Sequence, residues 1–183
     1  MFLDIILLSF LVAFIRGGRI KEVPTFQKLT LLFISIGLQL LSMFLPQFGG
    51  VFVSIAYIFT LLFFFFNREF EDIRIFLIGW FLNALVIWTN FGKMPIDLEL
   101  AKRLPYSVEG IVNGTDFKHA VLSEATQLPF LSDIMYMPYP VARVISIGDI
   151  FIMLAAFLLV QRIMNKPISL IRLREGKSYV AKQ

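Results

Sequence analysis

The stretch "VFVSIAYIFTLLFFFF" (Val51–Phe66) decides the fold class, because it is an unbroken apolar run without a charged residue. Four similar runs lie at about Phe2–Ile15, Leu29–Leu45, Ile75–Thr89 and Val144–Ile163. The chain of 183 residues is 58% hydrophobic with a mean hydropathy of +0.80, whereas soluble domains are about 45–50% apolar. The sequence therefore predicts an all-α, polytopic membrane protein with five transmembrane helices.

The lengths and flanks of these runs bear on how they insert. Several runs have only about 15–17 residues, fewer than the roughly 20 that cross a hydrocarbon core, so flanking residues or local thinning would cover the difference. The first run contains Asp4 and is followed by the basic stretch "IRGGRIK", which is not the order of a cleaved signal peptide. Between the second and third runs, "PQFGG" predicts a tight connection and an antiparallel helical hairpin.

The Lys and Arg residues indicate the orientation. Most of them fall in the 16–28 and 68–74 connections and after residue 161, whereas the 90–143 segment balances five basic residues with six acidic ones. By the positive-inside rule, the N-terminus and the 90–143 segment lie outside a bacterial inner membrane and the C-terminus is cytoplasmic. The predicted organisation is four transmembrane helices in 1–89, an extracytoplasmic cap in 90–143, a fifth helix in 144–164 and a basic tail in 165–183. The tail would lie on anionic lipid or in solvent.

The 90–143 segment is too long to lack structure, and two short helices are predicted in it. In "PIDLELAKRLP", Asp97 is a candidate N-cap, and Glu99 and Arg103 lie one turn apart as an ion pair. In "NGTDFKHAVLSEATQLP", Thr115 is a candidate N-cap and Pro129 ends the helix. The cap is therefore predicted to be partly helical.

The second of these helices is predicted to be amphipathic. At about 100° per residue its apolar side chains form one stripe, and its polar arc holds Asp116, His119, Ser123, Thr126 and Gln127. Glu124 lies off this arc, so a His119–Glu124 pair is disfavoured. The expected partners of the single histidine are Asp116, Ser123 and Thr126. This face either seals the outer end of the bundle or forms a polar binding site.

Other acidic residues share the depth of this face. Asp4 and Asp149 lie near the outer ends of the first and fifth helices, and Asp133 lies in the cap. Ser146 and Asp149 also match a capping arrangement, which gives Asp149 a structural alternative. Asn83 is expected to join helices. The candidate outer-face polar site consists of Asp4, Asp116, His119, Ser123, Thr126, Asp133 and Asp149.

The composition excludes several classes of chemistry. The chain has no cysteine, so disulfides, thiolate nucleophiles and cysteine metal sites are excluded. With one histidine a metal site would depend on aspartates, and we predict none; the sequence names no cofactor. A Ser123–His119–Asp133 hydrolase would need a nucleophile elbow, which the sequence lacks. No catalytic residue is therefore assigned, and the net charge of +4 is attributed to orientation rather than to a nucleic-acid partner.

Three motifs carry a resemblance to a known family. They are "FGKMPID" after the fourth apolar run, "HAVLSEATQLPFLSDI" in the cap and "SIGDIF" at the start of the fifth run. Together they resemble an uncharacterised bacterial family of small polytopic integral membrane proteins, known as a domain of unknown function. The resemblance implies a multi-pass protein of the bacterial cell membrane and transfers no catalytic residue.

These observations lead to two expectations for function. The first is a non-enzymatic binding, transport-associated or accessory subunit in the lipid bilayer, which recognises a lipid headgroup, an ion or another membrane protein at its outer face. The alternative is a membrane enzyme that uses His119 with an aspartate as acid and base.

Overall fold

In the computed structural model, which describes residues 3–20 and 24–170, each of the five apolar runs contains an α-helix. These helices are α1 (Leu3–Ile15), α2 (Leu29–Phe44), α3 (Gly49–Phe66), α4 (Glu71–Thr89) and α7 (Ile147–Ile163). The prediction of a helical protein is confirmed for the bundle. The prediction of an all-α fold is wrong in the cap, because the chain there also forms short strands.

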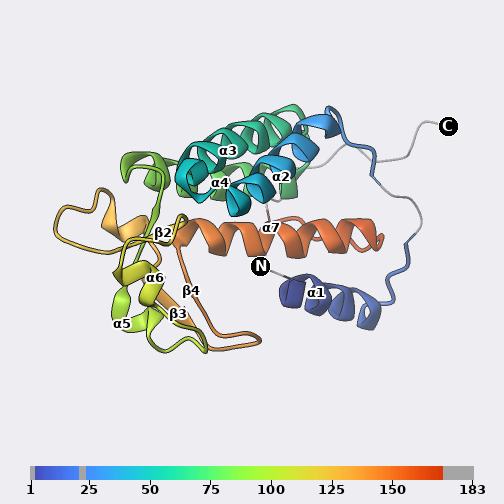
Figure 1. Cartoon of the computed structure of the whole chain (residues 1–183). Helices are drawn as coiled ribbons and strands as arrows, with labels where there is room; N and C mark the ends of the chain where they lie inside the picture. The colour runs from blue at the N-terminus through green and yellow to red at the C-terminus, as the bar shows by residue number, and fades with distance from the viewer. Residues whose placement is uncertain (1–2, 21–23, 171–183) are drawn as a thin grey trace.

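The helices do not pack in chain order. In Figure 1, α2 lies on α3, α3 on α4, α4 on α7, and α7 on α1, so the first and last helices of the chain are neighbours. The cap gathers where α4 ends and α7 begins. The predicted hairpin of α2 and α3 is confirmed, with the short helix η1 (Pro46–Phe48) as its connection.

Helices α4 and α7 approach each other closely at two glycines. A Cβ added at Gly148 would lie 1.9 Å from Asn83 Oδ1, and one added at Gly79 would lie 2.7 Å from the Gly148 carbonyl oxygen. At the other end of the pair, Arg162 on α7 donates to both carboxylate oxygens of buried Asp72 on α4, at 2.8–3.2 Å. Glycines and polar pairs therefore bring these two helices together at both ends.

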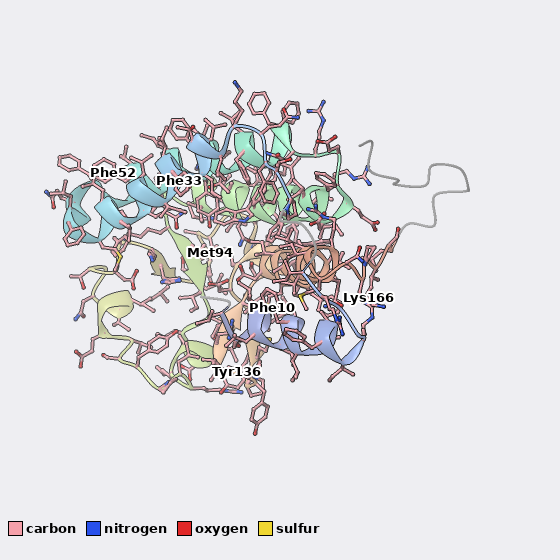
Figure 2. The ribbon with its side chains drawn as sticks, turned by 90° about the vertical axis from the view of Figure 1, so that its right-hand side faces the viewer. Phe10, Phe33, Phe52, Met94, Tyr136 and Lys166 are labelled. Atoms are coloured by element: carbon pink, nitrogen blue, oxygen red, sulfur yellow. The ribbon has the colours of Figure 1, made fainter. Side chains whose placement is uncertain are left out.

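Large apolar side chains cover the outside of the bundle. Figure 2 shows this layer, with Phe33 of α2 and Phe52 of α3 labelled, and Phe33 is 64% exposed. By length and composition, α3 and α4 are able to cross a membrane, whereas α1 and α2 are apolar but shorter. Exposed apolar surface of this extent is typical of a surface that contacts lipid or another protein.

The cap is built from short elements joined by long-range pairing. They are β1 (Met94–Ile96), α5 (Leu98–Ala101), α6 (Glu109–Val112), β2 (His119–Val121), η2 (Pro129–Leu131), β3 (Met135–Met137) and β4 (Arg143–Ile145). Strands β1 and β2 pair in parallel, and β3 and β4 form an antiparallel pair. A small core of Ile96, Ala101, Leu104, Ile111 and Val144 lies between these elements.

The predicted amphipathic helix from Thr115 to Pro129 is wrong. Residues 119–121 form strand β2, and Pro129 begins the short helix η2 instead of ending a longer one. One oxygen of Asp116 accepts the backbone N–H groups of Lys118 and His119, and this local turn competes with helix formation. Pairing with β1 then fixes the extended conformation. The predicted polar arc of Asp116, His119, Ser123, Thr126 and Gln127 is therefore not formed, because these residues do not belong to one helix.

The first predicted cap helix is confirmed only in part. The Asp97 carboxylate accepts the Leu100 N–H at 3.0 Å as the N-cap of α5, but the helix is four residues long. The predicted Glu99–Arg103 ion pair is not formed, and Glu99 pairs with Lys102 at 2.6 Å. Most of the predicted basic tail, residues 171–183, lies outside the described residues.

Candidate functional site

Strand β1 places His119 and Asp133 close together. On one side, the register pairs Met94 of β1 with His119 of β2. On the other side, Ile96 forms a parallel bridge with Asp133, whose N–H donates to the Pro95 carbonyl oxygen at 3.0 Å. Two residues that are distant in the sequence are thus fixed on either side of one short strand.

His119 lies between two carboxyl groups. Its Nδ1 is 3.5 Å from Asp116 Oδ1, and its Nε2 is 3.9 Å from Asp133 Oδ2. The side chains of His119 and Asp116 are 33% and 30% exposed, but that of Asp133 is only 8% exposed. The imidazole therefore connects a half-buried carboxyl with a buried one.

The two carboxyl groups differ in their proton affinity. Partial burial acts to raise the pKa of Asp116, but hydrogen bonds from the His119 side chain and from the N–H groups of His119 and Lys118 outweigh it and hold this pKa well below its usual range. Burial raises the pKa of Asp133 well above its usual range, and the nearby Asp149 carboxyl adds to the effect. Asp116 therefore favours the ionised form, and Asp133 favours the protonated form.

Two buried polar atoms at this point lack partners. Within residues 3–20 and 24–170, neither Ser132 Oγ nor Asp133 Oδ1 has a hydrogen-bond partner, although both are shielded from solvent. A buried polar atom without a partner costs about 1–3 kcal/mol, so such atoms are few in folded proteins. Asp133 thus combines a raised proton affinity with an unused carboxyl oxygen.

Asp149 lies at the inner edge of this cluster and is held in place. The predicted capping box is confirmed, because Ser146 Oγ accepts the Asp149 N–H at 3.0 Å and the Asp149 carboxylate accepts the Ser146 N–H. Asn83 of α4 donates to Asp149 Oδ1 at 2.9 Å and accepts from Ser146 Oγ at 2.9 Å. Asn83 joins α4 to α7, as predicted, and holds the Asp149 carboxyl at the start of α7.

Three of the predicted site residues make other contacts. Asp4 pairs with Arg143, so its charge is compensated at the edge of the cap. Thr126 Oγ1 accepts the Ser123 N–H at 2.9 Å, and both residues belong to an exposed turn after β2. Of the predicted partners of His119, Asp116 is therefore the one beside it, while Ser123 and Thr126 bond to each other.

Sequence analysis did not predict three residues near Asp133. Ser132 directly precedes it, and nothing in a single Ser-Asp dipeptide distinguishes that serine from one in a solvated loop. Tyr57 of α3 and Tyr106 of the cap also lie in electrostatic range of Asp133. Burial raises the pKa of Tyr106, with smaller contributions from Asp133 and Asp116. A tyrosine within an apolar run was the one available signal for Tyr57.

The described part of the chain contains no group of three or more His, Asp and Glu side chains arranged to hold a metal ion. The groups around Asp133 and Asp149 are carboxyl, imidazole, hydroxyl and amide side chains, several of which are hydrogen-bonded to one another. They are Asn83, Asp116, His119, Ser132, Asp133, Ser146 and Asp149, and we refer to them as the acid cluster.

Comparison with known proteins identifies the family. A model described as "Family of unknown function (DUF5317)" matches residues 23–161, which include the whole acid cluster, and the chain belongs to this family. A protein of Thermotoga maritima described as "Uncharacterized protein" is 30% identical over 162 residues, which cover 86% of this chain and 89% of that protein. No solved structure matches the chain. The predicted resemblance to a family of unknown function is confirmed.

Proposed function

We propose that this member of the DUF5317 family is a multi-pass membrane protein that acts as a non-enzymatic, transport-associated subunit and binds a proton on its His119–Asp133 pair. The observation that carries the proposal is the position of His119, between the half-exposed Asp116 and the buried Asp133 with its unpartnered oxygen. The cap that holds this pair lies at the outer end of the bundle, outside the cytoplasm.

Membrane insertion is supported by the apolar exterior of the bundle. Helices α3 and α4 have the length and composition of spans, and large apolar side chains are exposed along α1 and α2 as well. In water, this surface would favour association or aggregation, whereas in lipid it is the expected exterior. The balance of Lys and Arg supports an outer N-terminus and a cytoplasmic C-terminus.

The geometry suggests how the proton is held. When Asp116 accepts a hydrogen bond from His119 Nδ1, the imidazole is oriented and Nε2 becomes the position that exchanges a proton. A proton released from the Asp133 carboxyl binds Nε2, which leaves the carboxylate and an imidazolium paired with each other. The 3.9 Å separation between Nε2 and Asp133 Oδ2 requires a small approach of the side chains or one bridging water.

Other titratable groups face this pair. Asp149 from α7, Tyr57 from α3 and Tyr106 from the cap all interact electrostatically with Asp133. A second carboxyl beside Asp133 makes double ionisation unfavourable, which adds to the effect of burial in favouring a protonated Asp133. A binding site for a single proton matches these groups better than a site for a multivalent metal ion.

The single histidine makes a direct test possible. In the full chain labelled with 15N-histidine and reconstituted in lipid, the His119 imidazole gives one set of NMR signals. Because Asp133 Oδ2 lies 3.9 Å from Nε2, we expect the imidazole signals to respond to the proton on Asp133 when pH is varied, and Asp133→Asn should remove this response. Ser123→Ala, in the neighbouring turn, should keep the signals of the parent chain. Identical imidazole signals in the parent chain and in Asp133→Asn throughout the pH series would rule out the shared proton.

Membrane insertion and orientation are tested separately. Because the chain has no cysteine, single cysteines can be introduced without background. Cysteines at Lys102, Glu109 and Lys118 should react with a membrane-impermeant thiol reagent in intact cells, and cysteines at Arg19 and Lys177 should not. The reverse pattern contradicts the orientation, and recovery of the chain in the soluble fraction contradicts insertion.

A membrane enzyme with His119 as acid and base remains the second candidate. The observation that favours it is that Asp116, besides its contact with His119, lines an open groove next to the acid cluster. If a substrate of this groove is identified, His119→Ala should abolish its turnover. Retained turnover excludes the acid/base role.

A further inference from the structure

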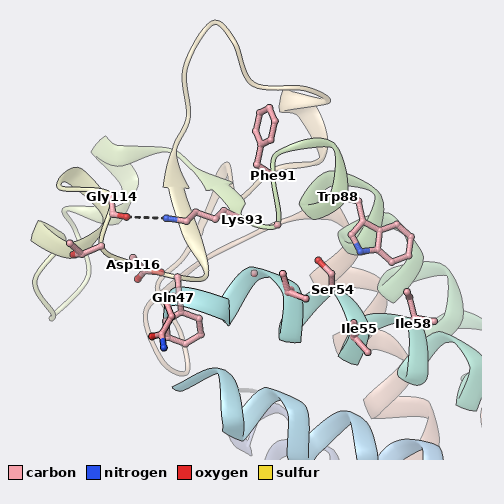
Figure 3. Close-up of a pocket in the computed structure, with 14 residues that line it drawn as sticks. Gln47, Ser54, Ile55, Ile58, Trp88, Phe91, Lys93, Gly114 and Asp116 are labelled. Atoms are coloured by element: carbon pink, nitrogen blue, oxygen red, sulfur yellow. Dashed lines mark hydrogen bonds between the residues drawn. The ribbon is translucent and has the colours of Figure 1, made fainter. Parts of the chain in front are cut away.

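Two adjoining cavities form one groove along α3 and α4. The first, of about 600 Å³, lies between the start of α3, the end of α4 and the loops of the cap (Figure 3). The second, of about 240 Å³, continues between α3 and α4 toward their other ends. The two cavities adjoin at Ile58 and Trp88, which line both of them.

The cap end of the groove is polar and contains a lysine that forms none of the ion pairs of the described residues. Lys93 Nζ donates to the Gly114 carbonyl oxygen at 3.0 Å, and none of the ion pairs found in residues 3–20 and 24–170 involves Lys93. The nearby Asp116 carboxylate is held by two backbone N–H groups and by its contact with His119. Because an ammonium has three donors, Lys93 keeps hydrogen-bonding capacity for an anion.

The other end of the groove is apolar. Leu61, Leu62 and Phe65 of α3 face Leu77 and Phe81 of α4 across it. Beyond Ser54 the lining residues of α3 are all apolar, and this stretch from Ile55 to Phe65 is about 15 Å long at 1.5 Å per residue. This length equals about half of a 30 Å hydrocarbon core, which is the depth of one leaflet.

Trp88 lies where the polar and apolar parts meet, and it is 40% exposed. A half-exposed tryptophan between polar and apolar surroundings is typical of the boundary between headgroups and acyl chains. From the cap inward, the groove thus presents a cation, an aromatic ring and an apolar furrow. These three parts match, in the same order, the phosphate of a phospholipid, the boundary below its headgroup and an acyl chain.

We propose that this groove binds one phospholipid molecule, with the phosphate on Lys93 and an acyl chain between α3 and α4. The inference rests on the proposed membrane insertion but not on the proton site. Phosphate is the matching anion because Lys93 forms none of the ion pairs of the described residues and is accessible from the groove. A soluble anion would leave the apolar furrow empty, so a lipid is the occupant that uses both ends.

The proposal is tested with the full chain purified in mild detergent and analysed by native mass spectrometry. We expect the parent chain to retain one phospholipid, and Lys93→Gln to retain it about five-fold less, since one cation near the headgroup is lost. Lys93→Arg should retain it. The matched control is Lys102→Gln, because Lys102 is an exposed cap lysine paired with Glu99 and lies outside the groove.

Three outcomes would overturn the proposal. They are a parent chain that retains no phospholipid, equal retention by the parent and Lys93→Gln, and displacement of the lipid by millimolar inorganic phosphate. A Leu62→Trp variant, which fills the furrow and leaves Lys93 intact, should also lose the lipid, and unchanged retention contradicts an acyl chain between α3 and α4. Failure of membrane insertion is detected independently by the cysteine labelling.

Discussion

The bundle and the cap treat buried polar groups differently. In the bundle, buried Ser35 bonds to Thr60 at 2.6 Å, and buried Asp72 is paired with Arg162. In the cap, Ser132 Oγ and Asp133 Oδ1 are buried without partners, and they are the two such side-chain atoms in the described chain. The helices thus satisfy their polar groups, whereas the cap leaves two unsatisfied beside its only histidine.

This difference predicts how substitutions in the two regions change the free energy of unfolding. Polar contacts between helices stabilise the bundle, since a buried polar group without a partner costs about 1–3 kcal/mol. Buried polar groups without partners in the cap cost stability. Substitutions in the two regions should therefore have opposite effects.

The largest loss is expected from Asp72→Ala. In the parent chain the Arg162 guanidinium donates to both Asp72 carboxylate oxygens, and the substitution removes this partner from the α4–α7 contact. Removing one member of a buried ion pair costs about 3 kcal/mol or more, and thermal unfolding in detergent should show it. Glu99→Ala, which removes an exposed pair with Lys102, is the control and should change stability by less than about 0.5 kcal/mol. Equal losses of stability in Asp72→Ala and Glu99→Ala would contradict a stabilising buried ion pair between α4 and α7.

A smaller loss is expected from Gly148→Ala. The added methyl group would overlap Asn83, which must then rotate and lose its bonds to Ser146 and Asp149. Overpacking of this kind costs about 2 kcal/mol. Gly37→Ala in α2 is the matched control, because nothing lies within 4 Å of its added Cβ. It should be neutral or stabilising by up to about 1 kcal/mol, and a loss of equal size in both variants contradicts a specific α4–α7 contact.

The same contrast explains which features the sequence was able to predict. The bundle helices follow from apolar runs, and the capping box of α7 follows from Ser146 and Asp149 three residues apart, so both are local signals. Strand β2 depends on pairing of His119 with Met94, and no local pattern contains that information. Residues 115–128 have a helical periodicity by coincidence, which tertiary pairing overrides.

The candidate site was predictable in composition but not in geometry. Shared depth grouped Asp4, Asp116, His119, Asp133 and Asp149 at one end of the molecule. The sequence does not contain the information that Asp4 pairs with Arg143, since any of several cap cations was available. It also does not show that β1 fixes Asp133 beside His119. That arrangement depends on two separate pairings of β1, with His119 along one edge and with Asp133 along the other.

The smallest effect has the opposite sign and lies in the cap. Burial, assisted by Asp149, raises the pKa of Asp133 in the folded state above its unfolded value of about 3.9, so folding penalises the ionised form. The penalty is absent below pH 4, grows as pH rises toward the folded pKa and is constant above it. Asp133→Asn should therefore unfold a few degrees higher than the parent chain at pH 7, and the gain should vanish near pH 4.

Asp116→Asn is the matched variant with the reverse sign. Although partial burial opposes it, hydrogen bonds from His119 and from two N–H groups lower the pKa of Asp116, so its ionised form stabilises the fold above the unfolded pKa. The variant should unfold at a lower temperature than the parent at pH 7, by a small amount because the group is half-exposed and screened. This loss should shrink as pH falls below 4. If both variants shift in the same direction at pH 7, the two carboxyls do not differ in protonation, and His119 does not lie between an ionised and a protonated partner.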